Sequence, residues 1–592
     1  MATWKLDERT RYCWIGQSNE RIPLGVGTAK ALSPDVISQE FRVGGRTLWL
    51  RWRLVEEYVN VTLSFEGDGG DIQAVSLPGS FLPEQEKLTL ALPVMQGVLF
   101  DGRGEPFVKT LRHAGHENLS MAMLGYLSGR GGLLVTVEDY CDWRGRVGKR
   151  RDGSVFAVVE QEASLGAMRY ARQVRLYPVD ADLTSLCKCY RRRVRQRGDW
   201  KSWDEKISER PAVERLFGAM MAFIGYNQSN IDYVAQCREL QQMGFDRVFV
   251  YPVRHNTYRT DWKMGGDDPI CLSDSQISAI KQLGFDVAPW TWVEQAMDDG
   301  AEATRKGFRY DKSGEPIAAW RIDEFQWYRC CTPHQEQFVM DAYAGPMKEM
   351  TWTHYDVNAA AGPKECYALD HPSHVGEALD RSGDLQFLRR LLGSGTNGNR
   401  IVSSEGFLDT LACSYDIGTS KMLPAFGDSA CWTVPMTMLV YHDSLLHDWW
   451  ELHNYNAHGG RFECTSVFGC RTEGFARQKA AMDALYGSPP NVFPFGRQYR
   501  WVDRAAHTTD SFSVRLEDPP VREAIGLALP VTRLHRKIGK LEMLQHEFLS
   551  EDGAVQMTVF SDGTHVVANF ARQVRQVEGV GQMEPLSWKV RE

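Results

Sequence analysis

Apolar and polar residues alternate with a period of two through most of the first 195 residues. The alternation is clearest in Arg46–Leu54, Tyr58–Phe65 and Gly132–Val137. Turns rich in Gly and Asp, such as Gly67–Asp71, separate runs of this kind. A period of two is typical of strands with one buried face. Because almost no helical pattern interrupts the runs, residues 1–195 are predicted to form a large N-terminal β-sandwich.

From residue 196 onward, apolar runs of strand length alternate with segments of helical periodicity. The expected strands are 217–226, 245–253, 285–292, 350–357, 399–404 and 436–441. The expected helices are 231–244, 273–284, 331–344, 376–393, 473–486 and 520–538. This alternation implies right-handed βαβ units and a parallel sheet. Its length fits a (β/α)₈ TIM barrel over residues 196–540 better than an open sheet.

The last part of the chain returns to a strand pattern. Ala554–Phe560 and Thr564–Phe570 lie on either side of the turn Ser561–Gly563. Residues 541–592 are therefore expected to form a small C-terminal β-sandwich. The predicted organisation is multidomain, with two β domains flanking an α/β barrel.

The charge balance and apolar runs limit the classes of partner. The chain has 68 Lys and Arg against 76 Asp and Glu, a formal net charge of −8, so no nucleic-acid partner is expected. No run approaches the roughly 18 apolar residues of a membrane span. The charged N-terminus lacks the apolar core of a signal peptide, and no membrane partner is expected. Reduced thiols favour a cytoplasmic location, and a removed export signal is the alternative. The sequence is compatible with a homo-oligomer.

The cysteines and histidines show no recognised metal-ligand spacing. The chain has 13 Cys but no CxxC pair, which is consistent with reduced thiols. The adjacent Cys330 and Cys331 lack the spacing of zinc ligands. A His-rich stretch begins at His442, and its spacings of 5, 6 and 5 residues do not match HExxH. The sequence therefore predicts no catalytic metal and no required cofactor.

Two acidic residues close consecutive predicted strands of the barrel. Asp356 and Glu405 are 405 − 356 = 49 residues apart, enough for one crossover with an added loop. Barrel enzymes place their chemistry at the carboxyl ends of strands, and neighbouring strands lie about 4.8 Å apart. A retaining glycosidase needs two carboxyl groups about 5–5.5 Å apart. We favour a catalytic pair, although either acid alone also fits an ion pair or a helix cap.

Other polar and aromatic residues, most of them at the predicted strand ends, are candidates for binding a sugar. They are Tyr226, Asp261, Trp290, Trp292, Glu294, His354, Asp416, His442 and Asp443. Trp290 and Trp292 fall on one face of their strand and fit a sugar platform, and core packing explains them equally well. His354 shares a face with Asp356, so it either orients that carboxylate or packs in the core.

The loop after the second strand carries further acidic residues. Asp261 lies there with Asp267 and Asp268, and these side chains fit either a pocket lining or a structural calcium site. For Asp267 and Asp268, solvation at the surface is the simpler interpretation. The sequence is therefore compatible with a structural calcium site in this loop.

Several short motifs resemble a known group of enzymes. They are Tyr355-Asp356, Ser403-Ser404-Glu405-Gly406, Tyr415-Asp416 and Tyr441-His442-Asp443, together with the linker pattern Tyr190-Arg191…Gly198-Asp199-Trp200…Lys206…Pro211…Gly218-Ala219. The sequence resembles the retaining α-N-acetylgalactosaminidases of glycoside hydrolase families 101 and 129 and their uncharacterised relatives. The resemblance covers most of the chain and implies the same order of β-supersandwich, barrel and small β domain.

The resemblance also implies roles for the acidic pair. Asp356 is then the nucleophile and Glu405 the general acid/base of a double displacement, with a carbohydrate as substrate. One alternative is an α-galactosidase or α-glucosidase of another barrel family, in which Asp443 replaces Glu405. A second alternative is a non-catalytic carbohydrate-binding protein with a degenerate barrel.

Overall fold

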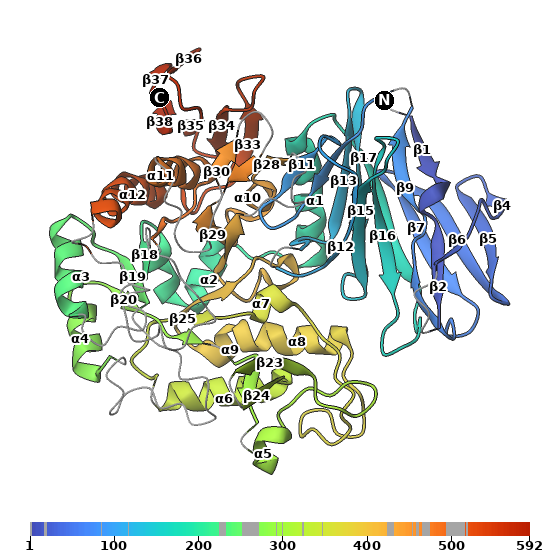
Figure 1. Cartoon of the computed structure of the whole chain (residues 1–592), viewed down its shortest axis with the longest axis horizontal. Coiled ribbons are helices and arrows are strands. Elements are labelled where there is room, and N and C mark those ends of the chain that lie inside the picture. The colour runs from blue at the N-terminus through green and yellow to red at the C-terminus, as the bar shows by residue number, and fades with distance from the viewer. Residues whose placement is uncertain are drawn as a thin grey trace.

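The computed structural model describes residues 3–591 except 17–20, 85, 116–117, 224–231, 252–271, 292, 299, 323–324, 346, 423–430, 453, 457–460, 464–473, 493–515 and 517–518. Figure 1 shows the described chain, with the N-terminal sheets in blue and the C-terminal sheet in red. Among the described residues, no helix is both long enough and apolar enough to span a membrane.

Two antiparallel sheets form the N-terminal sandwich. The larger has the order β28 (Trp432–Thr433), β11 (Val98–Phe100), β10 (Thr89–Leu92), β13 (Met123–Ser128), β14 (Gly131–Val137), β17 (Arg172–Val179), β7 (Tyr58–Phe65), β6 (Arg46–Val55), β5 (Val36–Val43) and β4 (Thr28–Ser33). The smaller has the order β12 (Phe107–Arg112), β15 (Trp143–Lys149), β16 (Val155–Glu162), β8 (Ile72–Val75), β2 (Tyr12–Ile15) and β3 (Arg21–Pro23). A separate pair joins β1 (Trp4–Asp7) to β9 (Ser80–Pro83).

The period-two pattern explains why these sheets pack face to face. In β7 only Val61 and Leu63 are buried, and they join one apolar cluster with Val147 of β15 and Ala157 of β16. Each inner face therefore supplies every second residue of its strands to a shared core, as aligned sandwiches require. The N-terminal β-rich prediction is confirmed.

The middle of the chain forms two parallel sheets. One has the order β20 (Asp286–Val287), β19 (Val248–Tyr251), β18 (Met220–Phe223) and β32 (Asn491–Val492). The other has the order β21 (Trp290–Thr291), β25 (Trp352–Tyr355), β26 (Ile401–Glu405), β27 (Ile417–Met422) and β29 (Leu446–Leu452). Only two residues separate β20 from β21 along the chain, and β29 lies against β32.

The helices are α1 (Leu183–Arg197), α2 (Trp203–Glu209), α3 (Tyr233–Gln242), α4 (Asp274–Gln282), α5 (Glu302–Arg305), α6 (Thr332–Ala344), α7 (Asn358–Ala361), α8 (Arg381–Leu392), α9 (Ser394–Asn397), α10 (Met436–Tyr441), α11 (Phe475–Tyr486) and α12 (Pro519–Ile538). Short 3₁₀ turns occur at Glu8–Thr10, Pro211–Leu216 and Asp409–Leu411. The predicted start of α4 is confirmed, because Ser273 and Gln276 form a reciprocal capping box.

Smaller sheets complete the molecule. An antiparallel insertion between β21 and α6 has the order β22 (Gln295–Met297), β24 (Phe325–Arg329) and β23 (Ala318–Ile322). The hairpin β30 (Asn454–Asn456) and β31 (Arg461–Glu463) follows β29. The C-terminal sheet has the order β33 (Met543–Phe548), β34 (Val555–Phe560), β35 (His565–Asn569) and β38 (Ser587–Arg591), beside the hairpin β36 (Arg575–Val577) and β37 (Gly581–Met583).

One strand prediction is wrong. Met436–Tyr441 is helix α10, and all six of its residues are buried. A short segment whose residues are all buried shows no alternation of apolar and polar positions. The hydrophobic pattern alone therefore does not distinguish a strand from a helix there. Two parallel strands, β27 and β29, lie where no strand was predicted. This shift changes the position of every candidate residue after Glu405.

Candidate active site

A cavity of about 870 Å³ lies where the parallel strands β25 and β26 meet the N-terminal sandwich. Its lining joins parts of the chain that are far apart in sequence. They are Arg112, His113, Ala114, Asn118, Cys141, Trp143 and Glu162 of the sandwich, Glu294, Arg309, Asp311, Lys312, Ile317, Ala318 and Arg329 of the β22–β24 insertion and its flanks, Val357, Ala360, Ala361, Pro363, Lys364, Glu365, Tyr367 and Arg381 after β25, and Glu405. The volume is within the usual range for small-molecule sites, about 300–1,000 Å³.

The parallel register brings the predicted acidic pair to the same level. Tyr355 of β25 is paired with Ser404 of β26, so the next positions, Asp356 and Glu405, follow side by side. Adjacent strands lie about 4.8 Å apart, and residues in parallel register point to the same face. The Asp356 amide continues the ladder by donating to Thr291 O at 2.8 Å, and the side chain is largely buried. The two carboxyl groups thus lie at neighbouring strand ends.

The backbone after each acid adopts a positive φ. Val357 has φ 68° and ψ −25°, a conformation that is costly for a β-branched residue. Gly406 has φ 85°, and a Cβ there would lie 2.9 Å from Ala360 Cα. Such strain persists only where the surroundings hold it, and it is common at functional sites. The turns after β25 and β26 are therefore packed against each other directly behind the two acids.

His354 lies beneath the pair in the core of the sheet. Its side chain is fully buried, and Nδ1 is 2.9 Å from Ser403 Oγ. Burial lowers the pKa of His354 to about 3, although the nearby charge of Glu405 acts in the opposite direction. The ring is therefore neutral at ordinary pH. It supports the strand ends without adding a positive charge.

The N-terminal sandwich forms part of the site. The Gly115 amide donates to Ala359 O at 3.0 Å, and a Cβ on Gly115 would lie 2.8 Å from that oxygen. His113 Nε2 lies 2.8 Å from Asp409 Oδ1 in the turn that follows β26. Both contacts are buried and join the sandwich to the strand ends. The cavity floor is therefore shared between two domains.

Charged side chains of both signs surround the cavity. Glu294 is buried and forms an ion pair with Arg329, and both residues line the cavity. Burial lowers the pKa of Lys364 to about 8 among nearby cations such as Arg112. Tyr367 adds an aromatic ring to the same wall. This mixture offers many hydrogen-bond donors and acceptors to a polar, uncharged ligand.

Three predicted sugar-binding residues lie outside this cavity. Asp416 precedes β27 and is fully buried, and both of its oxygens accept from Arg210 at 2.7 Å. Asp443 lies between α10 and β29, where Arg191 donates to its two oxygens at 2.7 and 2.6 Å. His442 is buried next to the carbonyl oxygens of Leu541 and Gly487, at 2.6 and 2.9 Å. The structure thus places all three before their strands begin, where they hold other elements and do not line this cavity.

The remaining candidates lie partly beyond the described structure. Tyr226, Asp261 and Trp292 lie outside the described residues, as do the acidic residues of the proposed calcium loop. Trp290 is described only in its backbone, which pairs with His354 in β21 and β25. Of the described residues predicted to bind sugar, Glu294 lines the cavity.

Sequence reasoning missed several cavity residues. Arg112, Arg309, Lys364 and Arg381 carry cationic groups to the cavity from four separate segments. None belongs to a motif, because each is placed by the packing of the sandwich and the insertion against the strand ends. The sequence held one local signal of the site. A β-branched residue, Val357, directly follows the strand-end acid Asp356, at a position where the chain has to turn.

The fold combines parallel strands that end at a cavity with a large β-sandwich that lines the same cavity. No protein-family model matches the chain, and no curated protein matches it. Among solved structures, the chain is similar to an α-N-acetylgalactosaminidase of Bifidobacterium bifidum in complex with GalNAc. That similarity has a TM-score of 0.72 and 17% identity, and covers 96% of this chain and 94% of that one.

The same enzyme in complex with Gal-NHAc-DNJ gives a TM-score of 0.73 at 16% identity, covering 99% of this chain and 100% of the other. The ligand-free form gives 0.70 at 17% identity. The two chains therefore share a fold over nearly their full length, and the resemblance predicted from short motifs is confirmed in the structure.

Proposed function

We propose that the two parallel sheets form one (β/α)₈ barrel and that the chain is a retaining α-glycoside hydrolase. Counting β20 and β21 as one interrupted strand gives eight positions in the order β18, β19, β20/β21, β25, β26, β27, β29 and β32. The parallel pairing of β32 with β18 supports closure of that ring. The acidic pair then lies at the catalytic end of the barrel.

The observation that carries the proposed function is the register of the acidic pair. Asp356 and Glu405 occupy the same level on adjacent parallel strands, and Glu405 lines the cavity. Adjacent strand ends about 4.8 Å apart suit a nucleophile and an acid/base about 5–5.5 Å apart, whereas an inverting enzyme needs about 6.5–9.5 Å between its carboxyl groups to hold a water. A double displacement is therefore favoured over a single one.

The reaction proceeds in two balanced steps. The Asp356 carboxylate attacks the anomeric carbon, while protonated Glu405 gives its proton to the departing glycosidic oxygen and the C–O bond breaks. Glu405 then removes a proton from water, which attacks the anomeric carbon and releases the Asp356 carboxylate. The neutral ring of His354 brings no positive charge next to Glu405, which has to begin the cycle protonated.

The substrate we propose is a terminal α-N-acetylgalactosaminide. Support comes from the bound GalNAc named for the similar Bifidobacterium bifidum enzyme and from the near-complete overlap of the two chains. The cavity of this chain offers both donors and acceptors for sugar hydroxyl and amide groups. The alternative with Asp443 as acid/base is disfavoured, because that carboxylate is held by Arg191 outside the cavity lining.

Chemical rescue tests the two roles separately. Asp356→Gly and Glu405→Ala would be incubated with an activated aryl α-GalNAc and sodium azide, and the azide products analysed by NMR. We expect β-glycosyl azide from Asp356→Gly, because azide attacks the face opposite the aglycone. We expect α-glycosyl azide from Glu405→Ala, because azide displaces Asp356 from the glycosyl-enzyme.

The matched control is Asp443→Ala, in which azide should yield no glycosyl azide. Rescue of that variant would instead assign the acid/base to Asp443. Wild-type activity on α-Gal or α-Glc, with none on α-GalNAc, would keep the mechanism and change the sugar. Early release of the β-anomer from an α-glycoside would exclude the double displacement.

A further inference from the structure

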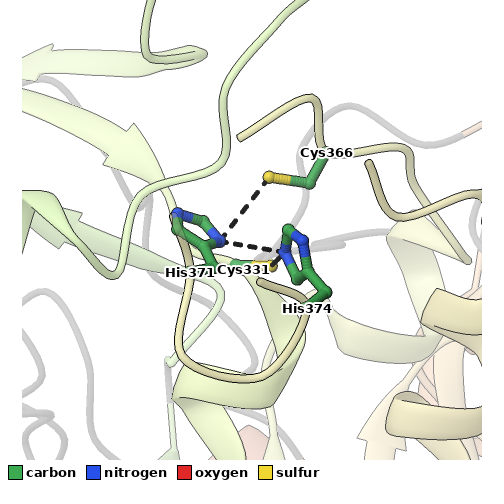
Figure 2. Close-up of side chains that lie close together, drawn as sticks. All are labelled: Cys331, Cys366, His371 and His374. Atoms are coloured by element: carbon green, nitrogen blue, oxygen red, sulfur yellow. Dashed lines mark hydrogen bonds between the residues drawn. The ribbon is translucent and has the colours of Figure 1, made fainter. Parts of the chain in front are cut away.

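Four metal-ligating side chains meet beside the cavity wall. Cys331 is the N-cap residue of α6, and Cys366, His371 and His374 lie on the segment between α7 and α8. One ligand atom from each of the four lies within 4.8 Å of every other, and three of the residues are buried. Figure 2 shows the two rings and two thiols directed toward a common centre.

The distances within this cluster match those of tetrahedral coordination. With Zn–S of about 2.3 Å and Zn–N of about 2.0–2.1 Å, the edges of a tetrahedral site are about 3.3 Å between nitrogens and about 3.6 Å between nitrogen and sulfur. His371 Nδ1 and His374 Nε2 are 3.0 Å apart. Cys331 Sγ lies 3.4 Å from His374 Nε2, and Cys366 Sγ lies 3.8 Å from His371 Nδ1.

We propose that Cys331, Cys366, His371 and His374 bind a structural Zn²⁺ ion. Two thiols and two imidazoles are a donor set that selects zinc over hard cations. Four protein ligands leave no open position, which is the arrangement of structural rather than catalytic zinc. The site is thus distinct in kind from the acidic pair, and it does not depend on the proposed glycosidase activity.

The surroundings of the cluster also suit a bound metal. His374 Nδ1 lies 2.9 Å from Glu377 O, so a backbone carbonyl fixes the tautomer that leaves Nε2 available. The Tyr310 amide donates to Cys366 Sγ at 3.5 Å, a contact that stabilises a metal-bound thiolate. Both thiols are free of disulfide bonding. The ring of His374 and the thiol of Cys366 are therefore both oriented by backbone groups.

Zinc at this position fixes one wall of the cavity. Lys364, Glu365 and Tyr367 flank Cys366 in sequence, and all three line the cavity. Cys331 caps the start of α6 and follows the insertion strand that carries Arg329. The metal would join these two segments, which are 366 − 331 = 35 residues apart in sequence. A short chain segment with little helix or strand is thereby held rigid.

Elemental analysis of the full-length protein tests the proposal. The chain would be purified under reducing conditions without chelator, and zinc measured by mass spectrometry for wild type, Cys366→Ser, His374→Ala and Cys330→Ser. Cys330 is the matched control, because it is a buried cysteine adjacent to Cys331 but outside the cluster. We expect one zinc per chain in wild type and Cys330→Ser, and loss of zinc in the other two.

Cobalt substitution of the wild-type protein gives a readout that needs no variant to fold. Co²⁺ should produce the visible d–d bands and the sulfur-to-metal charge-transfer band of tetrahedral thiolate coordination. A folded, reduced wild-type protein that contains no zinc and shows no such spectrum would overturn the proposal. So would a Cys331–Cys366 disulfide in the protein as purified, or full zinc occupancy in His374→Ala.

Discussion

The same dipeptide, Tyr-Asp, occurs at two strands of one parallel sheet, β25 and β27, and has opposite surroundings. Tyr355-Asp356 closes β25, where Asp356 reaches the level of Glu405 beside the cavity. Tyr415-Asp416 opens β27, where Asp416 is fully buried against Arg210. One acid lies at the carboxyl end of its strand and the other at the amino end. Strand direction, rather than local sequence, decides whether such an acid reaches the cavity end of the sheet or holds the fold.

The largest expected effect is on catalytic activity, and it distinguishes Asp356 from Asp416. Asp356→Asn should lower kcat/KM by more than about a thousandfold, because the nucleophile is lost and the side-chain volume is kept. The Tm of this variant should stay close to that of wild type. Asp416→Asn should keep kcat/KM per folded molecule. Steady-state kinetics and thermal unfolding of both variants would measure the contrast, and equal activity losses would remove the distinction.

The second effect is on the free energy of unfolding, and it is expected for Asp416. Asp416→Asn leaves the buried Arg210 charge without its partner, so the free energy of unfolding should fall by about 3–5 kcal/mol. Replacing both residues in Arg210→Met, Asp416→Leu should recover part of that loss. Chemical denaturation of the single and double variants measures it. A loss below about 1 kcal/mol for Asp416→Asn would be typical of an exposed pair instead.

A third effect concerns pH and compares His354 in the site with His546 of β33 in the C-terminal sheet. Burial lowers the pKa of each to about 3. A histidine in the unfolded chain has a pKa of about 6.5. Below that pH the unfolded state binds more protons than the folded state, so the free energy of unfolding falls by about 1.4 kcal/mol per pH unit for each buried histidine. The stabilisation is complete above about pH 6.5 and is lost as pH falls toward 3.

His546→Gln should therefore reduce the slope of unfolding free energy between pH 6 and 4 by about 1.4 kcal/mol per pH unit. Its kcat/KM at pH 7 should be unchanged, since His546 contacts Thr558 rather than the cavity. Denaturation at several pH values would check the slope. An unchanged slope would mean that His546 is already protonated in the folded protein.

The smallest effect tests the strained turn after Asp356. Val357→Gly removes the penalty of a positive φ at a β-branched residue, so stability should change by no more than about 1 kcal/mol. The same change frees the backbone that fixes Asp356, so kcat should fall several-fold with little change in KM. Kinetics and unfolding of Val357→Gly would test both. Unchanged kcat would show that the strain does not serve catalysis.

Much of the fold was readable from residue patterns, and the site only in part. The alternation in Tyr58–Phe65 and the Ser cap of α4 predict their elements correctly, because each is a local effect. Met436–Tyr441 is misassigned, because its six buried residues carry no period. That error placed His442 and Asp443 at the carboxyl end of a strand, and the missed strand β27 hid that Asp416 lies at an amino end. The cavity arginines and the approach of Cys331 to Cys366, His371 and His374 depend on tertiary packing, which no local pattern records.

The strand β28 has a consequence for how the chain is made. This strand completes the edge of the large N-terminal sheet by pairing with β11, yet it lies at Trp432–Thr433. The ribosome must add 432 − 179 = 253 residues after β17 ends before that edge is covered. At about 5–20 residues per second, the open edge of β11 is exposed for about 10–50 s. During synthesis this edge is where a chaperone would most usefully bind, and where premature pairing with another nascent chain would begin.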